Sequence, residues 1–563
     1  MKRLDASRLT WVALALLLAG TAVFLLYEIR GTTLWFDEWS WVADRRGGGL
    51  DALLAPHNQH LSLVPVLIYK ALFATAGLDD YAPYRVCIVA AHLVCCALVF
   101  VYARRRIGGP AALAATAVLL LLGPAWQDII WPFQVGSVIS LATGVGALVL
   151  LDRRDRLGDA GACALVALSL ASSGNGLPVA IGIAVEVLVV RRRPRDVWIV
   201  AAPVALYAVW WLAYQEATFV RHNVVLVPGF AADAAAGVLA ALTGLSGPQN
   251  AGTAETAGWG RPLALAAVAL LTWRLMRRPV PGRALTLLAI LVSFWLLTGL
   301  QRAQIAAPDS GRYLYVGALF ILLLVAELAQ GVRIARGAGI VVAAAALFAI
   351  VANLGDLRDG ARYLTAQSEI ARADLGALEL AHDSIPPGYV ATRLPGYPLV
   401  VLRADRLLAA ADQLGSPAAG AAEIETLTEE ARAAADGELA LIHRAALRTA
   451  GGPAGSETPA VDAVSGGAAT TAGHCVRFRA DAARAGDASP ELQITLPSAG
   501  LRLSASDGPA TVSLRRFAAA FPSTPLGTVA PGASAVLRIR EDHAPVPWHV
   551  RIAPQGHVTA CGL

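Results

Sequence analysis

Charged residues, and lysine above all, are scarce in this sequence of 563 residues. Only 15% of the residues are charged, against roughly 25% in soluble globular proteins, and Lys2 and Lys70 are the only lysines. Neither lysine follows a glycine, so the chain has no Walker A loop and is not an ATP-driven pump of that type. The patterns H-E-x-x-H, G-x-S-x-G and C-x-x-C are also absent, which excludes the common local signatures of zinc proteases, serine hydrolases and thiol oxidoreductases. Any chemistry must therefore use scattered residues.

Apolar residues make up 56% of the chain and come in blocks without charges. Each block is about 15 to 20 residues long, the length that a helix needs to cross a bilayer core of ~30 Å. We therefore predict an α-helical polytopic membrane protein with about 11 transmembrane helices. The predicted spans are 9–27, 84–103, 110–123, 133–151, 160–173, 177–190, 197–215, 260–276, 284–300, 313–330 and 337–353. The first follows a basic N-terminus and is predicted to be a signal anchor rather than a cleaved signal peptide.

Clusters of arginine in alternate loops set the expected orientation. They lie at 104–106, 153–156, 191–195, 274–283 and 333–336. By the positive-inside rule these loops and the N-terminus face the cytoplasm, so the first loop, 29–83, and the C-terminal part lie outside. The prediction is a multi-pass protein of the cytoplasmic membrane with an extracytoplasmic C-terminal domain.

Two other apolar stretches, 61–77 and 231–246, do not fit as spans. Counting either one alone would reverse the orientation of every later basic loop. We expect both to be helices in or dipping into the outer interface. For the second stretch, a short span paired with the first remains the alternative.

The C-terminal part differs in kind from the rest. Residues 1–355 hold 28 Lys/Arg and 19 Asp/Glu, whereas residues 356–563 hold 18 and 22. We predict a mainly helical region at 356–450, with helices near 360–382 and 420–450. A low-complexity linker at 451–473 and a small β-sandwich of short alternating strands at 474–563 follow. Cys475 and Cys561 bracket the sandwich, and outside the membrane they would form a disulfide; two free thiols are the alternative.

The first predicted outer loop holds the most unusual polar residues. Asp37 and Glu38 stand together in the aromatic segment 34–41, which would anchor them at the membrane surface. On a regular element adjacent acids point in different directions, so one rather than both faces a ligand. Further on, Pro56 opens an amphipathic run in which a helix would place His57 and His60 on one face.

With these features the sequence resembles the GT-C superfamily of membrane glycosyltransferases. The likeness consists of a first span that leads outward into a loop opening on the acidic pair Asp37-Glu38, then interfacial helices, many further spans and an external C-terminal domain. Protein O-mannosyltransferases, the aminoarabinose transferase of lipid A, and actinobacterial arabinosyl- and mannosyltransferases are members. The resemblance covers the architecture of the whole membrane half but depends on a short motif.

The resemblance implies transfer of a sugar from a polyprenyl-phosphate carrier to a glycan, lipid or protein acceptor on the outer face of the membrane. Asp37 would be the general base, and Glu38 would support it or bind a divalent metal with the histidines. No cofactor is certain. One interpretation is a divalent metal bound by Asp37, His57 and His60; the alternatives are that the histidine pair binds the sugar or is simply polar at the interface. No D-x-D motif follows in an outer loop, and no nucleic-acid partner is expected.

A cation near the outer interface would stabilise the departing lipid phosphate. The candidates are Lys70, Arg85, Arg221, Arg261, Arg302 and Arg312. We favour Arg312, which with Tyr313 enters a span after a small-residue turn, over Arg85. Ordinary anchoring at the membrane boundary is the alternative for both arginines.

Two more outer turns have the composition of a sugar site. Gln127 and Asp128 lie between tryptophans, and Asn175 lies in a turn of serines and glycines. Either turn is equally typical of an ordinary loop. The rival functions for the whole chain are a transporter or flippase of lipid-linked sugars and a non-catalytic membrane scaffold. A transporter would place ionisable groups near the bilayer midplane, whereas Glu186 and Glu327 lie toward predicted cytoplasmic ends.

Overall fold

The computed structural model of this chain divides into two compact units. The membrane unit comprises Met1–Thr32, Asp44–Ala76 and Asp80–Thr365, and the C-terminal unit comprises Thr33–Ala43, Gly77–Asp79 and Ala366–Leu563. The structure describes all residues apart from 1, 215–219, 248, 251–252, 255–256, 333–334, 396, 399, 450–454, 456 and 482–488. Each unit is described by itself.

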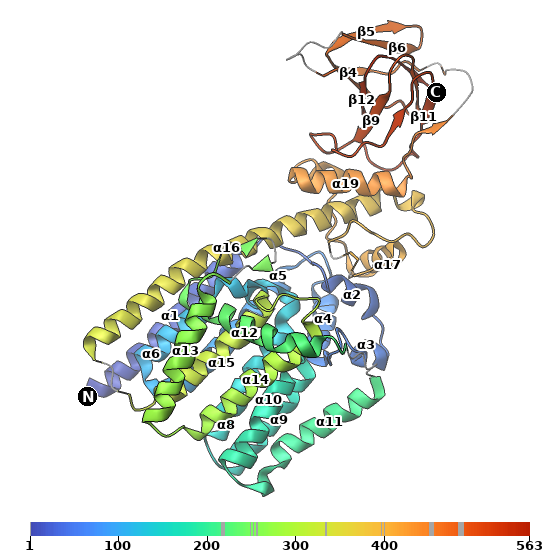
Figure 1. The fold of residues 1–563 in the computed structure, drawn as a ribbon. Helices are drawn as coiled ribbons and strands as arrows, with labels where there is room; N and C mark the ends of the chain where they lie inside the picture. The colour runs from blue at the N-terminus through green and yellow to red at the C-terminus, as the bar shows by residue number, and fades with distance from the viewer. Residues whose placement is uncertain are drawn as a thin grey trace. The chain divides into compact units, whose positions relative to one another are not determined.

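The membrane unit is a bundle of α-helices (Figure 1). Its helices are α1 (Lys2–Glu28), α3 (Leu50–Leu54), α4 (Leu63–Thr75), α5 (Ala82–Ile107), α6 (Gly109–Leu120), α7 (Trp126–Ile130), α8 (Val135–Leu151), α9 (Arg156–Ser172), α10 (Gly176–Val185), α11 (Trp198–Tyr214), α12 (Asn223–Thr243), α13 (Ala257–Arg277), α14 (Gly282–Arg302), α15 (Gly311–Leu328) and the first part of α16 (Arg336–Leu380). Short turns of 3₁₀-helix are η1 (Gly123–Ala125), η2 (Pro132–Gln134) and η4 (Pro194–Asp196), and η3 (Glu186–Val190) is a π-helix. Strands β1 (Gln249–Asn250) and β2 (Thr253–Ala254) form a small antiparallel pair.

Eight of the described helices are long and apolar enough to cross a membrane, and nine if the bent pair formed by α6 and the η1–α7 segment is one span. The fold class is confirmed, but the count of eleven is not. The predicted span 160–173 is part of α9, which carries Arg156 and Asp159 in its first turn, and the predicted span 177–190 is a shorter apolar helix. The predicted span 260–276 lies in α13, where arginines near both ends shorten the apolar stretch.

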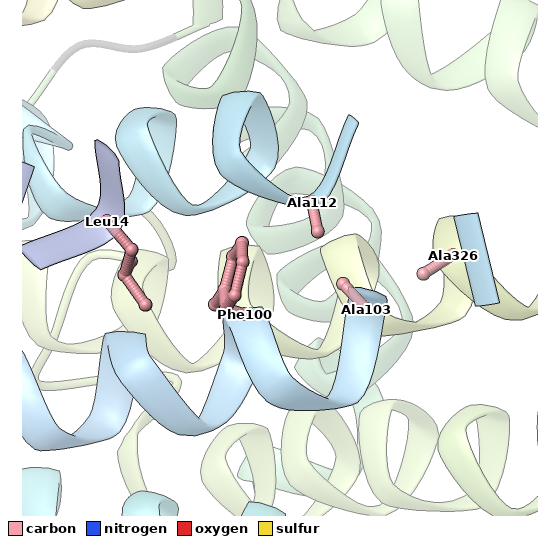
Figure 2. Packing of buried hydrophobic residues seen from close by; sticks show 5 residues of the cluster. All are labelled: Leu14, Phe100, Ala103, Ala112 and Ala326. Atoms are coloured by element: carbon pink, nitrogen blue, oxygen red, sulfur yellow. The ribbon is translucent and has the colours of Figure 1, made fainter. Parts of the chain in front are cut away.

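The packing of α1, α5, α6 and α15 shows why the bundle is tight. Phe100 of α5 is fully enclosed and forms one buried cluster with Leu14 of α1, Ala103 of α5, Ala112 of α6 and Ala326 of α15 (Figure 2). The alanines let the helix backbones approach closely, which is how helices associate in lipid, where dispersion replaces the hydrophobic effect. The ring of Trp11 also meets Phe100 edge to face, with the ring centroids 5.1 Å apart.

One end of the bundle, called here the ion-paired end, is closed by a network of charges. Arg106 contacts Glu327 and lies 3.2 Å from Asp152. Arg283 lies 3.0 Å from Asp152 and 3.3 Å from Glu186. These side chains come from α5, α14, α15, η3 and the end of α8, so the network joins elements that are far apart in the sequence. Buried charges are tolerated because they are paired.

The opposite end is called the Arg312 end, since α14 ends there at Arg302 and α15 begins there with Gly311. Helix α12 contains most of the stretch 231–246. Both termini of α12 are hydrogen-bonded to elements at the Arg312 end of the bundle. Asn223 donates from Nδ2 to the carbonyl of Leu300 at 2.8 Å, and Asn353 donates to the carbonyl of Ala241 at 3.0 Å. Asn353 and the start of α15 both pack on η1. Attachment of both ends to one side suits an interfacial helix, although α12 is also long enough to span.

In the C-terminal unit, helices precede a two-sheet sandwich. Besides α2 (Glu38–Asp44), the unit contains the last part of α16, η5 (His382–Ser384), α17 (Ala404–Leu414), α18 (Ala421–Ile424) and α19 (Glu429–Ile442). The strands are β3 (Arg448–Thr449), β4 (Val461–Ser465), β5 (Gly467–Ala472), β6 (Cys475–Ala480), β7 (Glu491–Thr495), β8 (Leu501–Ala505), β9 (Ala510–Arg515), β10 (Gly527–Val529), β11 (Ser534–Leu537), β12 (His549–Pro554) and β13 (His557–Gly562).

The strands form two antiparallel sheets. One has the order β10-β9-β12-β7-β4 and the other the order β3-β11-β8-β13-β6-β5. Alternate residues such as Val550, Ile552, Leu501 and Leu503 are buried, as the period of two requires for sheets that pack face to face. Figure 1 shows both sheets at the C-terminal end of the chain.

Three details differ from the expected organisation. Strands β4 and β5 occupy part of 451–473, so the sandwich begins inside the stretch that we expected to be a linker. The last predicted span and the helix predicted at 360–382 are one helix, α16, and the boundary between the units falls within it, after Thr365, rather than at 355. Cys475 of β6 and Cys561 of β13 are directly opposed and are joined by a disulfide. Because β4 and β5 precede β6, this disulfide does not join the first strand of the sandwich to the last.

Candidate functional site

The acidic turn begins helix α2 in the C-terminal unit. Phe36 has a φ of 52°, a left-handed conformation that reverses the chain just before Asp37. Glu38 is the first residue of α2, and its Oε2 accepts a hydrogen bond of 2.9 Å from the backbone N–H of Trp35. Glu38 is fully buried, and its hydrogen bond to Trp35 shapes the turn, while Asp37 is 7% exposed.

Aromatic residues and α16 hold this turn in place. The backbone N–H of Thr33 donates to Ser368 Oγ of α16 at 2.9 Å. Trp39 and Trp41 are almost completely buried, and Trp39 lies with Leu375 and Leu378 of α16 around a small cavity. The aromatic segment therefore buries its rings in protein. A turn that is fixed on both sides can present a carboxylate with little loss of conformational entropy.

The histidine pair belongs to the membrane unit and is not helical. His57 and His60 face each other across a two-residue turn, with N···O distances of 3.0 and 2.9 Å between their backbones. Asn58 and Gln59 at the centre both have positive φ, 49° and 69°, as in a type I′ hairpin turn. The predicted helical spacing is therefore wrong, because a turn of asparagine and glutamine stands where an amphipathic helix was expected; that helix, α4, starts only at Leu63.

Cations surround the histidine turn. Arg302 donates from Nη2 to the carbonyl of Asn58 at 3.1 Å. Burial, and then the charges of Arg45 and Arg302 together with His60, lower the pKa of His57 to about 3. Burial and Arg302 lower the pKa of His60 to about 4. Both imidazoles are therefore neutral at physiological pH, and the turn supplies neutral nitrogen groups in a positive environment.

Arg45 has an organising role that the sequence did not reveal. It follows an acid and precedes another arginine, which is typical of a solvated surface loop. In the structure its guanidinium is buried and donates to the carbonyls of Asp51, Ala55 and Pro56, at 3.1, 2.8 and 3.0 Å. Arg45 thus fixes the chain that leads into the histidine turn and at the same time raises the positive potential there.

Arg312 begins α15 beside the turn that contains Gln127 and Asp128. Its backbone N–H lies 3.4 Å from Gln127 Oε1, and its guanidinium lies 5.5 Å from the ring centroid of Tyr313. Asp128 is completely buried and close enough for the charge of Arg312 to act on it, but Arg312 forms no ion pair with a described residue. Its Nε is buried without a hydrogen-bond partner. Arg312 therefore has unused hydrogen-bonding capacity.

The Asn175 turn connects the histidines with the Arg312 region. Asn175 Nδ2 donates to Ser137 Oγ at 3.0 Å, and Ser137 is close enough to influence Asp128. The neighbouring Gly174 lies flat against the ring of His60, where an added Cβ would come within 2.5 Å of the imidazole. The structure thus brings together the predicted residues of three loops. Ser137 is an addition that the sequence did not suggest, because a serine inside an apolar span carries no local signal.

Three other predicted cations have structural partners. Lys70 donates to the carbonyls of Arg45 and Gly47, at 2.8 and 2.7 Å. Arg85 donates to carbonyls at the end of α1, including that of Ile29 at 3.1 Å. Arg261 pairs with Asp233 at 3.0 Å. Arg312 and the exposed Arg221 remain as phosphate candidates at the Arg312 end, together with Arg302, which gives one hydrogen bond to the carbonyl of Asn58.

The residues around the histidine turn suit an anion better than a metal cation. Among the described residues there is no group of three or more His, Cys, Asp or Glu that could hold a metal ion. The charges that act on His57 from outside the pair are those of Arg45 and Arg302, which oppose a bound cation.

Comparison with known proteins finds similar solved structures. The chain is similar to ArnT from Cupriavidus metallidurans bound to undecaprenyl phosphate, with 15% identity and a TM-score of 0.43 over 73% of this chain and 89% of that one. The apo state of the same protein gives 15% identity and a TM-score of 0.46 over 73% and 90%. Arabinosyltransferase EmbB from Mycobacterium smegmatis gives 12% identity and a TM-score of 0.38 over 98% of this chain and 64% of that one. No protein-family model matches the chain, and no curated protein matches it.

Proposed function

We propose that this protein is a membrane glycosyltransferase that moves a sugar from a polyprenyl-phosphate donor to a cell-envelope glycan, lipid or protein. The observation that carries the proposal is the arrangement at the Arg312 end, where two arginines without ion pairs, Arg302 and Arg312, lie on loops that share neutral histidines and amides. Such a set can bind a phosphate and sugar hydroxyls at a membrane surface.

Each group has a distinct task in this mechanism. Arg312 donates hydrogen bonds to the phosphate, whose negative charge grows as the bond to the sugar breaks. The neutral rings of His57 and His60, with Gln127, orient the sugar hydroxyls, and Tyr313 gives the sugar an aromatic surface. Asp37 accepts the proton of the acceptor hydroxyl while the new C–O bond forms, and the buried Glu38 keeps the turn in shape.

The proposed location follows from the distribution of charge. The ion-paired end contains the arginine clusters that we predict to be cytoplasmic, so the Arg312 end faces the outside, as does the C-terminal unit. A lipid-linked donor would enter laterally from the outer leaflet, and the acceptor would arrive from the aqueous side. This orientation is testable by labelling single cysteines placed at exposed positions near Arg221 and Arg105.

A transfer assay tests the proposal. The protein is reconstituted in nanodiscs and given synthetic polyprenyl-phosphate mannose or arabinose with an envelope extract as acceptor, and the formation of new glycosidic bonds is measured. We expect Asp37→Asn to lower kcat by about a hundredfold or more, and Arg312→Gln by about a hundredfold. Arg362→Gln, which removes an exposed arginine paired with Asp359 at 2.8 Å, is the control and keeps full activity. Full transfer by the folded Asp37→Asn protein refutes the assignment of the base.

A flippase is the rival function. The buried acids that a flippase would use for transport have a structural role in this protein instead. Glu186 and Glu327, two buried acids of the bundle, belong to the ion-paired network: Glu327 contacts Arg106, and Glu186 lies 3.3 Å from Arg283 and accepts from Thr286 at 2.8 Å. They thus stabilise the bundle. Movement of a labelled lipid-linked sugar between leaflets without formation of a new glycosidic bond would favour the flippase.

A further inference from the structure

The C-terminal unit contains a large cleft lined by arginines. It has a volume of about 1110 Å³, and its walls come from the segment after η5, the end of α19, β3, β8 and the segment after β11. Five of the lining residues are arginines: Arg444, Arg448, Arg502, Arg538 and Arg540. A cleft in which one sign of charge predominates concentrates its field on the space inside it, so this cleft attracts anions.

The strand register explains why these arginines converge. Arg448 of β3 is directly opposite Val536 of β11, which is directly opposite Arg502 of β8. The three side chains therefore stand in one row on the same face of the six-stranded sheet. Neighbouring strands lie ~4.8 Å apart, so the Cα atoms of Arg448 and Arg502, which are two strands apart, are separated by about 10 Å.

The side chains of the five arginines form no hydrogen bond or ion pair with any described residue. Arg502 is half-buried, and its Nε is buried without a partner. The outer face of the other sheet is different, since Arg551 pairs there with Glu491 at 2.7 Å. The one acidic side chain in the lining, Asp383, pairs with His543 at 3.0 Å. The arginine side chains of the cleft are thus not neutralised by ion pairs with described residues, and four of the five are exposed to solvent, where an anion can reach them.

His443 gives a second and independent sign of a ligand. It lines the cleft, its side chain is fully enclosed, and its Nε2 donates to Asp542 at 2.9 Å. Asp542 also accepts from Arg516 at 2.7 Å, so this carboxylate fixes the imidazole. Nδ1 of His443 is buried and has no hydrogen-bond partner. A buried ring nitrogen without a partner is costly, and a hydroxyl of a bound ligand would satisfy it.

We propose that this cleft binds an anionic glycan, one that carries carboxylate or phosphate groups about 10 Å apart along the chain. The arginines bind the oxyanions, and His443 accepts from a sugar hydroxyl. The lining contains no aromatic side chain for stacking on a neutral sugar, so charge dominates recognition. The choice of a glycan among polyanions rests on the proposed function, because a sugar transferase meets charged glycans in the envelope.

Binding to the full-length protein in neutral-lipid nanodiscs tests this. Oligogalacturonate supplies carboxylates, phosphomannan supplies phosphates, and fully methyl-esterified oligogalacturonate is the uncharged control. We expect at least one charged glycan to bind in a salt-dependent manner and the ester not to bind. The double variant Arg448→Gln/Arg538→Gln should bind the charged glycan at least about tenfold more weakly than the wild type. The matched variant Arg403→Gln/Arg551→Gln, which removes the same charge from paired arginines outside the cleft, should bind like the wild type.

Equal loss in both double variants, equal binding of the ester, or binding only to vesicles of phosphatidylglycerol would overturn the proposal. The outcome is separable from that of the transfer assay. Asp37→Asn should lower transfer by about a hundredfold or more but leave glycan binding intact, so binding without transfer by the wild type in every assay would refute the proposed function alone. Transfer without binding would refute the anionic-glycan cleft alone.

Discussion

Acidification should weaken the membrane unit through the histidine turn. In the folded protein the pKa values of His57 and His60 are lowered to about 3 and about 4, whereas an unfolded histidine has a pKa of about 6.5. Below pH 6.5 the unfolded chain therefore takes up two protons that the folded chain rejects. Stability from this source is complete above pH 6.5 and is lost as the pH falls toward 4.

The size of the effect follows from the same pKa values. Between pH 7.5 and 5.5 each histidine would lose at most about 1.4 kcal/mol of folding free energy, because only the last pH unit lies below the unfolded pKa. Both rings are partly exposed, so screening by solvent reduces the loss to about 1 kcal/mol each. The pair together then contributes about 2 kcal/mol, a fall in Tm of about 2–4 °C for a protein of this size.

Thermal unfolding followed by tryptophan fluorescence at pH 7.5, 6.5 and 5.5 measures this effect. The informative quantity is the difference between the wild type and His57→Gln/His60→Gln, since other groups titrate in both. Between pH 7.5 and 5.5 the double variant should lose about 2 kcal/mol less free energy of unfolding than the wild type. His222→Gln replaces an exposed histidine and should behave like the wild type. The same acid sensitivity in the double variant and the wild type would refute the reasoning.

Three further changes test other parts of the fold. Cys475→Ser opens a disulfide across 86 residues and should destabilise the sandwich by up to about 4.6 kcal/mol, measured as a lower Tm that reductant no longer changes. Glu327→Gln removes one of the two carboxylates paired with the buried Arg106, leaves Asp152 as its remaining partner, and should cost about 1–3 kcal/mol, measured as faster thermal inactivation. Gly174→Ala pushes a methyl group into the ring of His60 and should cost about 1–3 kcal/mol and lower sugar transfer, measured by Tm and kcat.

Matched variants separate these effects from general damage. Asp359→Asn breaks an exposed i,i+3 pair and should change stability by less than about 0.5 kcal/mol. Gly229→Ala adds a methyl group in open space within α12 and should be neutral or slightly stabilising. If either control lost as much stability as its partner variant, the contacts named above would not be the cause.

The architecture could be predicted because its signals are local. Apolar blocks predict helices, and period-two alternation with turns predicts the strands from Cys475 onward. Strands β4 and β5 were not predicted, since β5 is built only of Gly, Ala and Thr, and the short β4 stands among small residues that look like a linker. These segments are strands because they pair with Glu491–Thr495 and Cys475–Ala480. Such long-range pairing cannot be read from the local composition.

The candidate site was predictable only in part. Composition indicated which loops would hold Asp37, His57 and Arg312, but spacing gave the wrong conformation for the histidines, because positive φ at Asn58 and Gln59 reflects the tertiary contact with Arg302 as well as turn propensity. The sequence could not show which cations remain available either. That depends on carbonyl groups brought close by folding, such as those that occupy Lys70.

The two ends of the membrane unit show why charge must be counted after pairing. Arginines are far more numerous in the clusters of the ion-paired end, so composition alone would place the best anion site there. In the structure, however, Arg106 and Arg283 are neutralised by Asp152, Glu186 and Glu327. At the other end Arg302 and Arg312 form no ion pair with any described residue, and the imidazoles beside Arg302 stay neutral. The candidate anion site is therefore defined by guanidinium groups without ion pairs beside neutral imidazoles, and not by the number of arginines in a loop.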